Sequence, residues 1–143
     1  PKGMTAHDVL KALRHLWPDM PMGVEIAFGP TASTYADAVF LMGSEGMTAV
    51  EVKVSRGDWL SELKDPGKRA PLMAAANRFY FATPAGLTTP AELPELCGLV
   101  EVEARTLKAR VTTGAKHLPS KSPDWLQTMR IANGIARAKE LGL

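Results

Sequence analysis

The sequence predicts an α/β protein in which helices flank a mixed sheet, with elements in the order α-β-β-β-α-β. Three observations predict this class. Residues 5–17 place apolar side chains at helical spacing. Residues 49–54 instead alternate apolar and charged side chains, as a half-buried strand does, and residues 22–28 and 35–42 are predicted as further strands. A helical segment separates residues 49–54 from an aromatic strand at 78–83, and a strand, crossover helix and strand imply a parallel pair.

Turn and capping residues set the limits of the first helix and the first strand. Thr5 and Asp8 have the spacing of a capping box, which predicts the start of the helix. Pro18 ends it, because proline lacks the backbone N–H that a helix needs. A Gly-Pro pair at 29–30 closes the strand that follows.

Shorter elements are expected in the second half of the chain. Ser55 and Asp58 have the spacing of a capping box before Trp59, and an Asp-Pro-Gly run at 65–67 interrupts that helix. The remaining elements are a helix at 68–76 with Pro71 in its first turn, a loop at 84–96, strands at 98–103 and 107–111 near a sheet edge, a polar loop at 112–123, and a helix at 124–141. This last helix has apolar residues at Leu126, Met129, Ile131, Ile135 and Leu141.

Composition bounds the class of protein. The 143 residues fit one domain, 1–143, and a content of 45% hydrophobic and 22% charged residues excludes wholesale disorder. No apolar run reaches the roughly 20 residues that cross a bilayer, so we expect no membrane partner. Cys97 is the single cysteine, is expected to pack in the core, and suits a reducing cytoplasm. The net charge of +2 permits a polyanionic partner.

Register decides where the charges of the central hairpin lie. A five-residue loop at 42–46 places Asp37 on one strand directly opposite Glu51 on the next, on the same face as Lys53. A loop of four residues pairs Asp37 with Val52 instead and turns its side chain away. The prediction of a common site therefore depends on the longer loop or on one bulge.

Two carboxylates directly across a strand pair repel each other, and their burial adds to the cost unless a cation compensates. Lys53 is one candidate cation, and a bound divalent metal is the other. A different interpretation remains open, in which one carboxylate lies at the surface and the other forms a cross-strand salt bridge with a lysine. In this interpretation Lys53 packs its aliphatic chain on the surface and its charge only neutralises the carboxylates.

These residues resemble the signature of the PD-(D/E)XK nuclease superfamily, with Asp37 followed by Glu51-Val52-Lys53. The surrounding sequence is similar to the MmcB-type DNA-repair family of that superfamily. The similarity is carried by the stretch from Glu51 to Trp59, by the segment ending in Lys64-Asp65, and by the run from Asn77 to Pro84, and it spans residues 24 to 103. The chain departs from the signature at Ala36, where the motif has proline.

The resemblance implies a restriction-endonuclease-like core and a metal-dependent active site. Asp37 and Glu51 would hold Mg²⁺ or Mn²⁺ together with the Val52 carbonyl, which suits a hard ion that takes few protein ligands. Lys53 would position or deprotonate the attacking water, or stabilise the charge that develops on the phosphate. Glu25 is the nearest candidate for an additional acidic ligand.

Each remaining candidate residue has two interpretations. Glu25 either joins the metal site or faces solvent, with Asp8 as the next acidic candidate. Six residues near the motif are expected to contact DNA: Ser55, Arg56, Lys64, Lys68, Arg69 and Arg78. The alternatives are a solvated basic face and, for Ser55, a helix cap. A weaker basic set comprises Lys108, Arg110, Lys116, His117 and Lys121. The aromatic run 79–81 is expected in the core rather than stacked on bases.

The sequence thus predicts a metal-dependent DNA nuclease that hydrolyses phosphodiester bonds, in DNA repair or in the processing of mobile elements. The alternative is a DNA-binding or partner-binding module on the same fold without turnover, because fold alone does not fix function. Whether the chain acts as a homodimer or within a larger repair or processing complex is left open.

Overall fold

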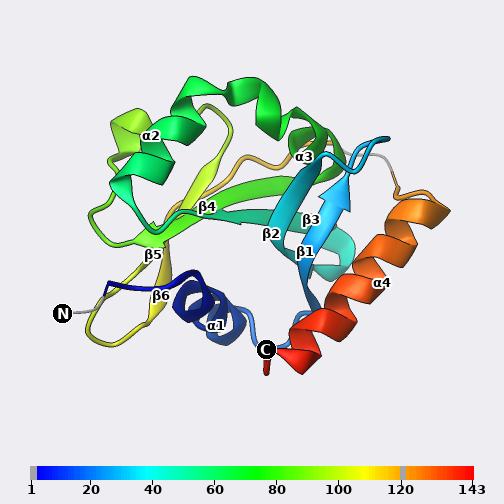
Figure 1. Cartoon of the computed structure of the whole chain (residues 1–143), viewed down its shortest axis with the longest axis horizontal. Helices are drawn as coiled ribbons and strands as arrows, with labels where there is room; N and C mark the ends of the chain where they lie inside the picture. The colour runs from blue at the N-terminus through cyan, green and yellow to red at the C-terminus, as the bar shows by residue number, and fades with distance from the viewer. Residues whose placement is uncertain (1–2, 120–121) are drawn as a thin grey trace.

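A six-stranded mixed sheet, in the spatial order β1-β2-β3-β4-β5-β6, forms the centre of the molecule (Figure 1). The computed structural model describes residues 3–119 and 122–143. The strands are β1 (Met22–Phe28), β2 (Thr34–Leu41), β3 (Met47–Val52), β4 (Arg78–Pro84), β5 (Gly98–Val102) and β6 (Ala109–Thr113). β3, β4 and β5 are parallel and the other neighbours are antiparallel. The predicted α/β class, the mixed sheet and the element order are confirmed.

Helices cover both faces of the sheet and one of its edges. They are α1 (Ala6–Leu16), α2 (Arg56–Lys64), α3 (Ala70–Ala75) and α4 (Trp125–Glu140), with short 3-10 turns η1 (Gly43–Glu45), η2 (Pro66–Arg69) and η3 (Pro90–Glu92). α2 and α3 lie over one face, α1 lies under the other, and α4 lies beside β1 (Figure 1). No helix within the described residues is long and apolar enough to cross a membrane.

Two hydrophobic clusters, one on each face of the sheet, form the core. The cluster under α2 and α3 contains Trp59, Phe79 and Phe81, and the one over α1 contains Leu13 and Tyr80. The expected core placement of the aromatic run 79–81 is therefore confirmed, as is the packing role of the buried Cys97. The reciprocal hydrogen bonds of the capping box also start α1 as predicted.

α4 packs against the edge strand β1 through small residues as well as through two of the five apolar residues that the sequence pattern suggested. Ile131 is buried and Ile135 packs against the core, together with the buried Gly134 and Ala138, whereas the other three predicted apolar residues are exposed. A Cβ atom at Gly134 would lie 2.5 Å from the Ile26 side chain. The close approach of helix and strand explains why a small residue occupies this position.

β6 begins and ends two residues later than predicted. The sequence indicated a strand at 107–111, and the structure places it at Ala109–Thr113. The reason is the preceding turn, in which the Leu107 N–H donates to the Glu103 carbonyl and Leu107 has a φ of 55°. The turn thereby takes up residues that alternation alone assigns to the strand, and the loop predicted at 112–123 is shortened accordingly.

Replacing the two helical glycines by alanine is expected to have opposite effects on stability. Gly134→Ala should lower the free energy of unfolding by about 1–3 kcal/mol, because the added methyl group overlaps Ile26. Gly57→Ala should raise it by about 0.4–1 kcal/mol, because nothing lies within 4 Å of that position and alanine lowers the entropy of the unfolded chain. Urea denaturation of both variants provides the test, and equal effects would show that α4 does not pack as described.

Candidate active site

The central hairpin has the register that brings the predicted carboxylates together. The loop spans residues 42–46, as the five-residue prediction requires, and Ala38 pairs with Val50. One step further along the same register, Asp37 lies opposite Glu51. The expectation of a shared face is therefore confirmed by the pairing, without a bulge.

Asp37 extends the hydrogen bonding between β2 and β3 through its side chain. Its Oδ2 atom accepts a hydrogen bond of 2.7 Å from the backbone N–H of Val52. Burial raises the pKa of the Asp37 carboxyl, while the Val52 N–H and the charge of Lys53 act in the opposite direction. This carboxyl group is thus fixed in position at the point where regular strand pairing ends.

Glu51 is a carboxyl group in an unfavourable environment for a negative charge. Burial, followed by the charge of Asp37, raises its pKa to about 8. Its buried Oε1 atom has no hydrogen-bond partner within the described residues. A buried, unpaired oxygen beside a second carboxylate is what a divalent cation would compensate, so the donor set fits Mg²⁺ or Mn²⁺.

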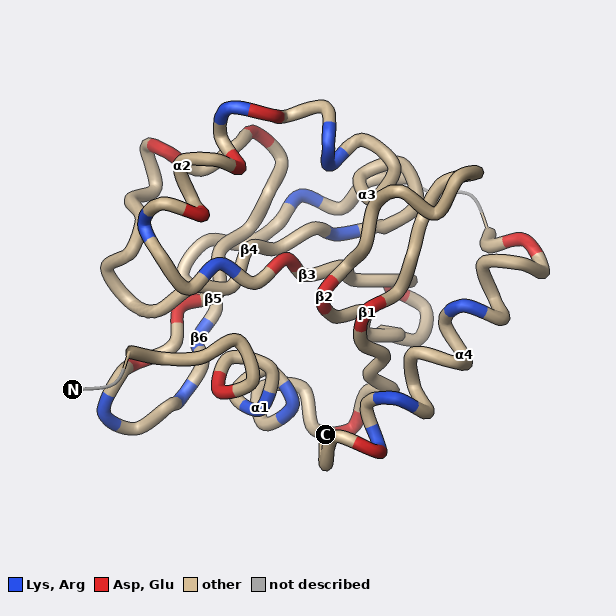
Figure 2. The backbone as a smooth tube through the Cα atoms, in the orientation of Figure 1, with Lys and Arg blue, Asp and Glu red and all other residues tan. Residues whose placement is uncertain are grey.

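Glu25, on the neighbouring strand β1, lies in line with Asp37 and Glu51 across the sheet. β1 and β2 pair at Val24 with Ala38 and at Ile26 with Ala36, which places Glu25 opposite Asp37. Figure 2 shows acidic positions of β1, β2 and β3 side by side. Within the described residues, however, no three His, Cys, Asp or Glu side chains gather closely enough to hold a metal ion. The geometry therefore supports two carboxylate ligands, with the exposed Glu25 nearby.

Lys53 is held by an acidic residue that the sequence analysis did not identify. Its Nζ lies 3.0 Å from Glu62 Oε1, and Arg69 Nη1 lies 2.7 Å from Glu62 Oε2. The Glu62 side chain is only 2% exposed. Although burial acts to raise the pKa of Glu62, hydrogen bonds from Arg69 and Lys53 lower it overall. Glu62 is thus a buried anion between two cations.

The prediction that Arg69 contacts DNA is not supported by its position. Its side chain is buried, bonded to Glu62, and stacked over Phe81 with 5.6 Å between the guanidinium carbon and the ring centroid. The sequence analysis gave Arg69 two interpretations, a DNA contact or part of a solvated basic face, and its burial agrees with neither. A buried charge needs a buried partner, and Glu62 supplies it.

Other predicted DNA contacts have partners within the protein. Ser55 accepts a hydrogen bond from the Asp58 N–H and caps α2, which agrees with the alternative interpretation of Ser55. Arg56 forms a bidentate salt bridge with Glu92 of η3. Arg78 pairs with Glu45 at 3.2 Å, at the far end of β3 and β4 from the candidate site.

Lys64 and Lys68 remain exposed, and neither forms a salt bridge within the described residues. Lys68 lies near enough to Glu51 to act on its pKa. The weaker basic set is also exposed where it is described, and it comprises Lys108, Arg110, Lys116 and His117. Lys121 lies outside the described residues. Lys68 is therefore an accessible cation near Glu51, and Lys64 is a further exposed cation at the end of α2.

Two features of the site went unpredicted. Glu62 follows Trp59 by three residues, so both lie on the buried side of α2, and a carboxylate within an apolar stripe is the signal that identifies it. The second feature is a cleft beside Asp37 that has Arg130 and Arg137 of α4 in its wall. No local motif indicates those arginines, because α4 follows β1 by about 100 residues in the chain.

Comparisons with known proteins bear on the fold. Neither the models of known protein families nor the curated proteins gave a match. Among solved structures, a protein of unknown function from Silicibacter pomeroyi is similar, with a TM-score of 0.60 and 22% sequence identity. The alignment covers 94% of this chain and 83% of that one. At this identity the similarity supports the α/β fold alone.

The raised pKa of Glu51 predicts how stability depends on pH in the metal-free protein. Between its ordinary value of 4.5 and about 8, the folded state binds a proton that the unfolded state releases, so stability falls as pH rises through this window. We expect the melting temperature to fall by several degrees across it, and Glu51→Gln to flatten the curve. The exposed Glu103→Gln is the control. Parallel curves for wild type and Glu51→Gln would exclude a buried titration at Glu51.

Proposed function

We propose that this protein is a metal-dependent DNA nuclease that hydrolyses phosphodiester bonds. One observation carries the proposal: two buried carboxyl groups, Asp37 and Glu51, oppose each other across β2 and β3, with an unpaired oxygen on Glu51 and an amine two residues further along the chain. Buried like charges are costly, and they are retained where they bind a cation.

Asp37 and Glu51 would hold the metal, together with the carbonyl of Val52. When bound, Mg²⁺ or Mn²⁺ supplies Lewis acidity that activates water and neutralises charge on the phosphate. Asp37 is already oriented by its bond to the Val52 N–H, so it meets a ligand without rearrangement. Glu51 would have to lose its proton to bind the cation, so metal binding should strengthen as pH rises towards 8.

Lys53 would act as a cation rather than as a base. An ammonium group has three donors, and Glu62 accepts from one of them at 3.0 Å. Two donors remain for the attacking water and for a phosphate oxygen. Because Glu62 also binds Arg69, the amine is held in place and stabilises negative charge as it develops in the transition state.

DNA is the proposed substrate, with repair or the processing of mobile elements in the cytoplasm as the setting. Lys64 and Lys68 are exposed, and Lys68 acts electrostatically on Glu51, so these two lysines would contact the phosphate backbone. Cations that track a backbone give affinity without reading sequence. We therefore expect cleavage with weak sequence preference.

Cleavage should require Mg²⁺ or Mn²⁺ and should fall at least 100-fold in Lys53→Met, because one preorganised donor to the transition state contributes about that much. Lys11→Met, which removes an exposed lysine of α1 on the opposite face of the sheet from α2, should cleave like wild type. Labelled single-stranded, nicked, branched and duplex DNA resolved on gels provides the measurement. Absent cleavage by wild type, or undiminished cleavage by Lys53→Met, would refute the nuclease. DNA binding without cleavage would instead favour the non-catalytic module.

Metal binding can be measured apart from cleavage. Mn²⁺ should raise the melting temperature of wild type in proportion to the logarithm of its concentration, since it binds only the folded site. Asp37→Asn should lose most of this rise, because the amide cannot supply a charged ligand. Glu101→Gln, which alters a carboxylate on β5, is the matched control. An equal rise in all three proteins would show that Mn²⁺ binds elsewhere.

A further inference from the structure

A cleft with a volume of about 540 Å³ opens beside Asp37, between the first two strands and α4. Its lining comprises Glu25, Ala27, Tyr35 and Asp37 from the strands, and Arg130, Asn133 and Arg137 from α4. The volume falls within the roughly 300–1,000 Å³ of small-molecule sites. Because Asp37 belongs to both, the cleft adjoins the proposed active site at this residue.

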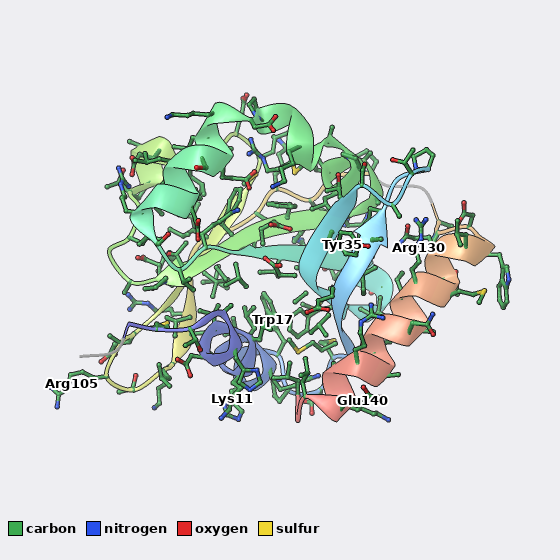
Figure 3. All side chains as sticks on the ribbon, in the orientation of Figure 1. Lys11, Trp17, Tyr35, Arg105, Arg130 and Glu140 are labelled. Carbon is green, nitrogen blue, oxygen red and sulfur yellow. The ribbon has the colours of Figure 1, made fainter. Side chains whose placement is uncertain are left out.

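Tyr35 presents an aromatic ring at the wall of this cleft. It is 56% exposed, and its ring stacks on no other aromatic side chain of the described residues. It precedes Asp37 by two residues on β2, so both side chains project from the same face of the sheet. Figure 3 shows Tyr35 on the strands and Arg130 on the facing helix. A planar group in the cleft would thus lie beside the active site.

The two arginines of the opposite wall are held in place by the edge strand. Arg130 Nη1 donates to the Gly29 carbonyl at 3.1 Å, and Arg137 Nη2 donates to the Glu25 carbonyl at 2.7 Å. Each guanidinium has five donors, so these bonds leave others for a ligand. The Nε of Arg137 is buried without a partner within the described residues. Fixed cations lose little entropy when they bind an anion.

We propose that this cleft binds one unstacked nucleotide of a single DNA strand, next to the phosphodiester at the active site. The inference rests on the proposed function. Tyr35 would stack on the base, Arg130 would contact the phosphate, and the amide of Asn133 would face the base edge. A duplex suits the cleft less well, because both faces of its bases are already covered by neighbouring bases.

Fluorescence anisotropy of labelled short oligonucleotides, with Ca²⁺ replacing Mg²⁺, measures this binding. Tyr35→Ala should weaken binding of a single strand about fivefold or more, which is the scale of one base stacked on an aromatic ring. Tyr35→Phe keeps the ring and should bind within twofold of wild type. Trp125→Ala removes an aromatic ring that is 76% exposed outside the cleft, and should leave binding unchanged.

Abasic strands show whether the contact is to a base. A series of strands is used in which each carries one abasic site at a different position. At one of these positions, wild type and Tyr35→Ala should bind with equal affinity, because the base that stacks on Tyr35 is missing. The proposal is overturned if wild type binds no single strand or if Tyr35→Ala binds like wild type. It is also overturned if Tyr35→Ala loses the same affinity relative to wild type at every position of the abasic site. Binding that depends on Tyr35, without cleavage, would support the nucleotide-binding cleft and refute the nuclease activity. Cleavage, with binding that does not depend on Tyr35, would support the nuclease activity and refute the nucleotide-binding cleft.

Discussion

The opposition of Asp37 and Glu51 across two strands is the constraint on which the rest of the candidate site depends. Strand pairing places these carboxyl groups together, and burial makes each of them costly to ionise. The protein offsets part of the cost at Asp37 with the Val52 N–H. It does not do so at Glu51, whose Oε1 lacks a partner within the described residues. The Glu51 carboxyl therefore keeps its proton to a higher pH than usual, which reduces its repulsion with Asp37.

The arrangement of the cations explains why the nearby positive charges offset only part of the cost of ionising Asp37 and Glu51. Lys53 and Arg69 both bond to Glu62, so their charges are shared with a third carboxylate. Glu62 lowers the net positive charge around Asp37 and Glu51, and its own negative charge acts to raise the pKa of both. The same residue thus orients the amine of Lys53 and adds negative charge near Asp37 and Glu51.

Sequence predicted the parts of this structure that depend on short-range pattern. It predicted the central hairpin and two possible registers, and the observed loop at 42–46 selects the one in which Asp37 faces Glu51. Contacts between distant elements were not predictable in the same way. Glu62 and Arg69 were missed as a buried pair because no local rule states which side of α2 faces Lys53. The predicted bounds of β6 were two residues too early because Leu107 adopts a turn conformation that the alternation of side chains does not indicate.

The contacts between α4 and β1 both stabilise the edge of the sheet and position side chains beside Asp37. An edge strand exposes unpaired carbonyls, and β1 has these satisfied by side chains of α4: Gln127 donates to Ala27, Arg130 to Gly29 and Arg137 to Val24 and Glu25. Arginines suit this task because each has donors to spare. Since they must reach β1, they also lie beside Asp37, which β2 holds next to β1. Closing the edge of the sheet therefore places fixed cations beside the carboxylates.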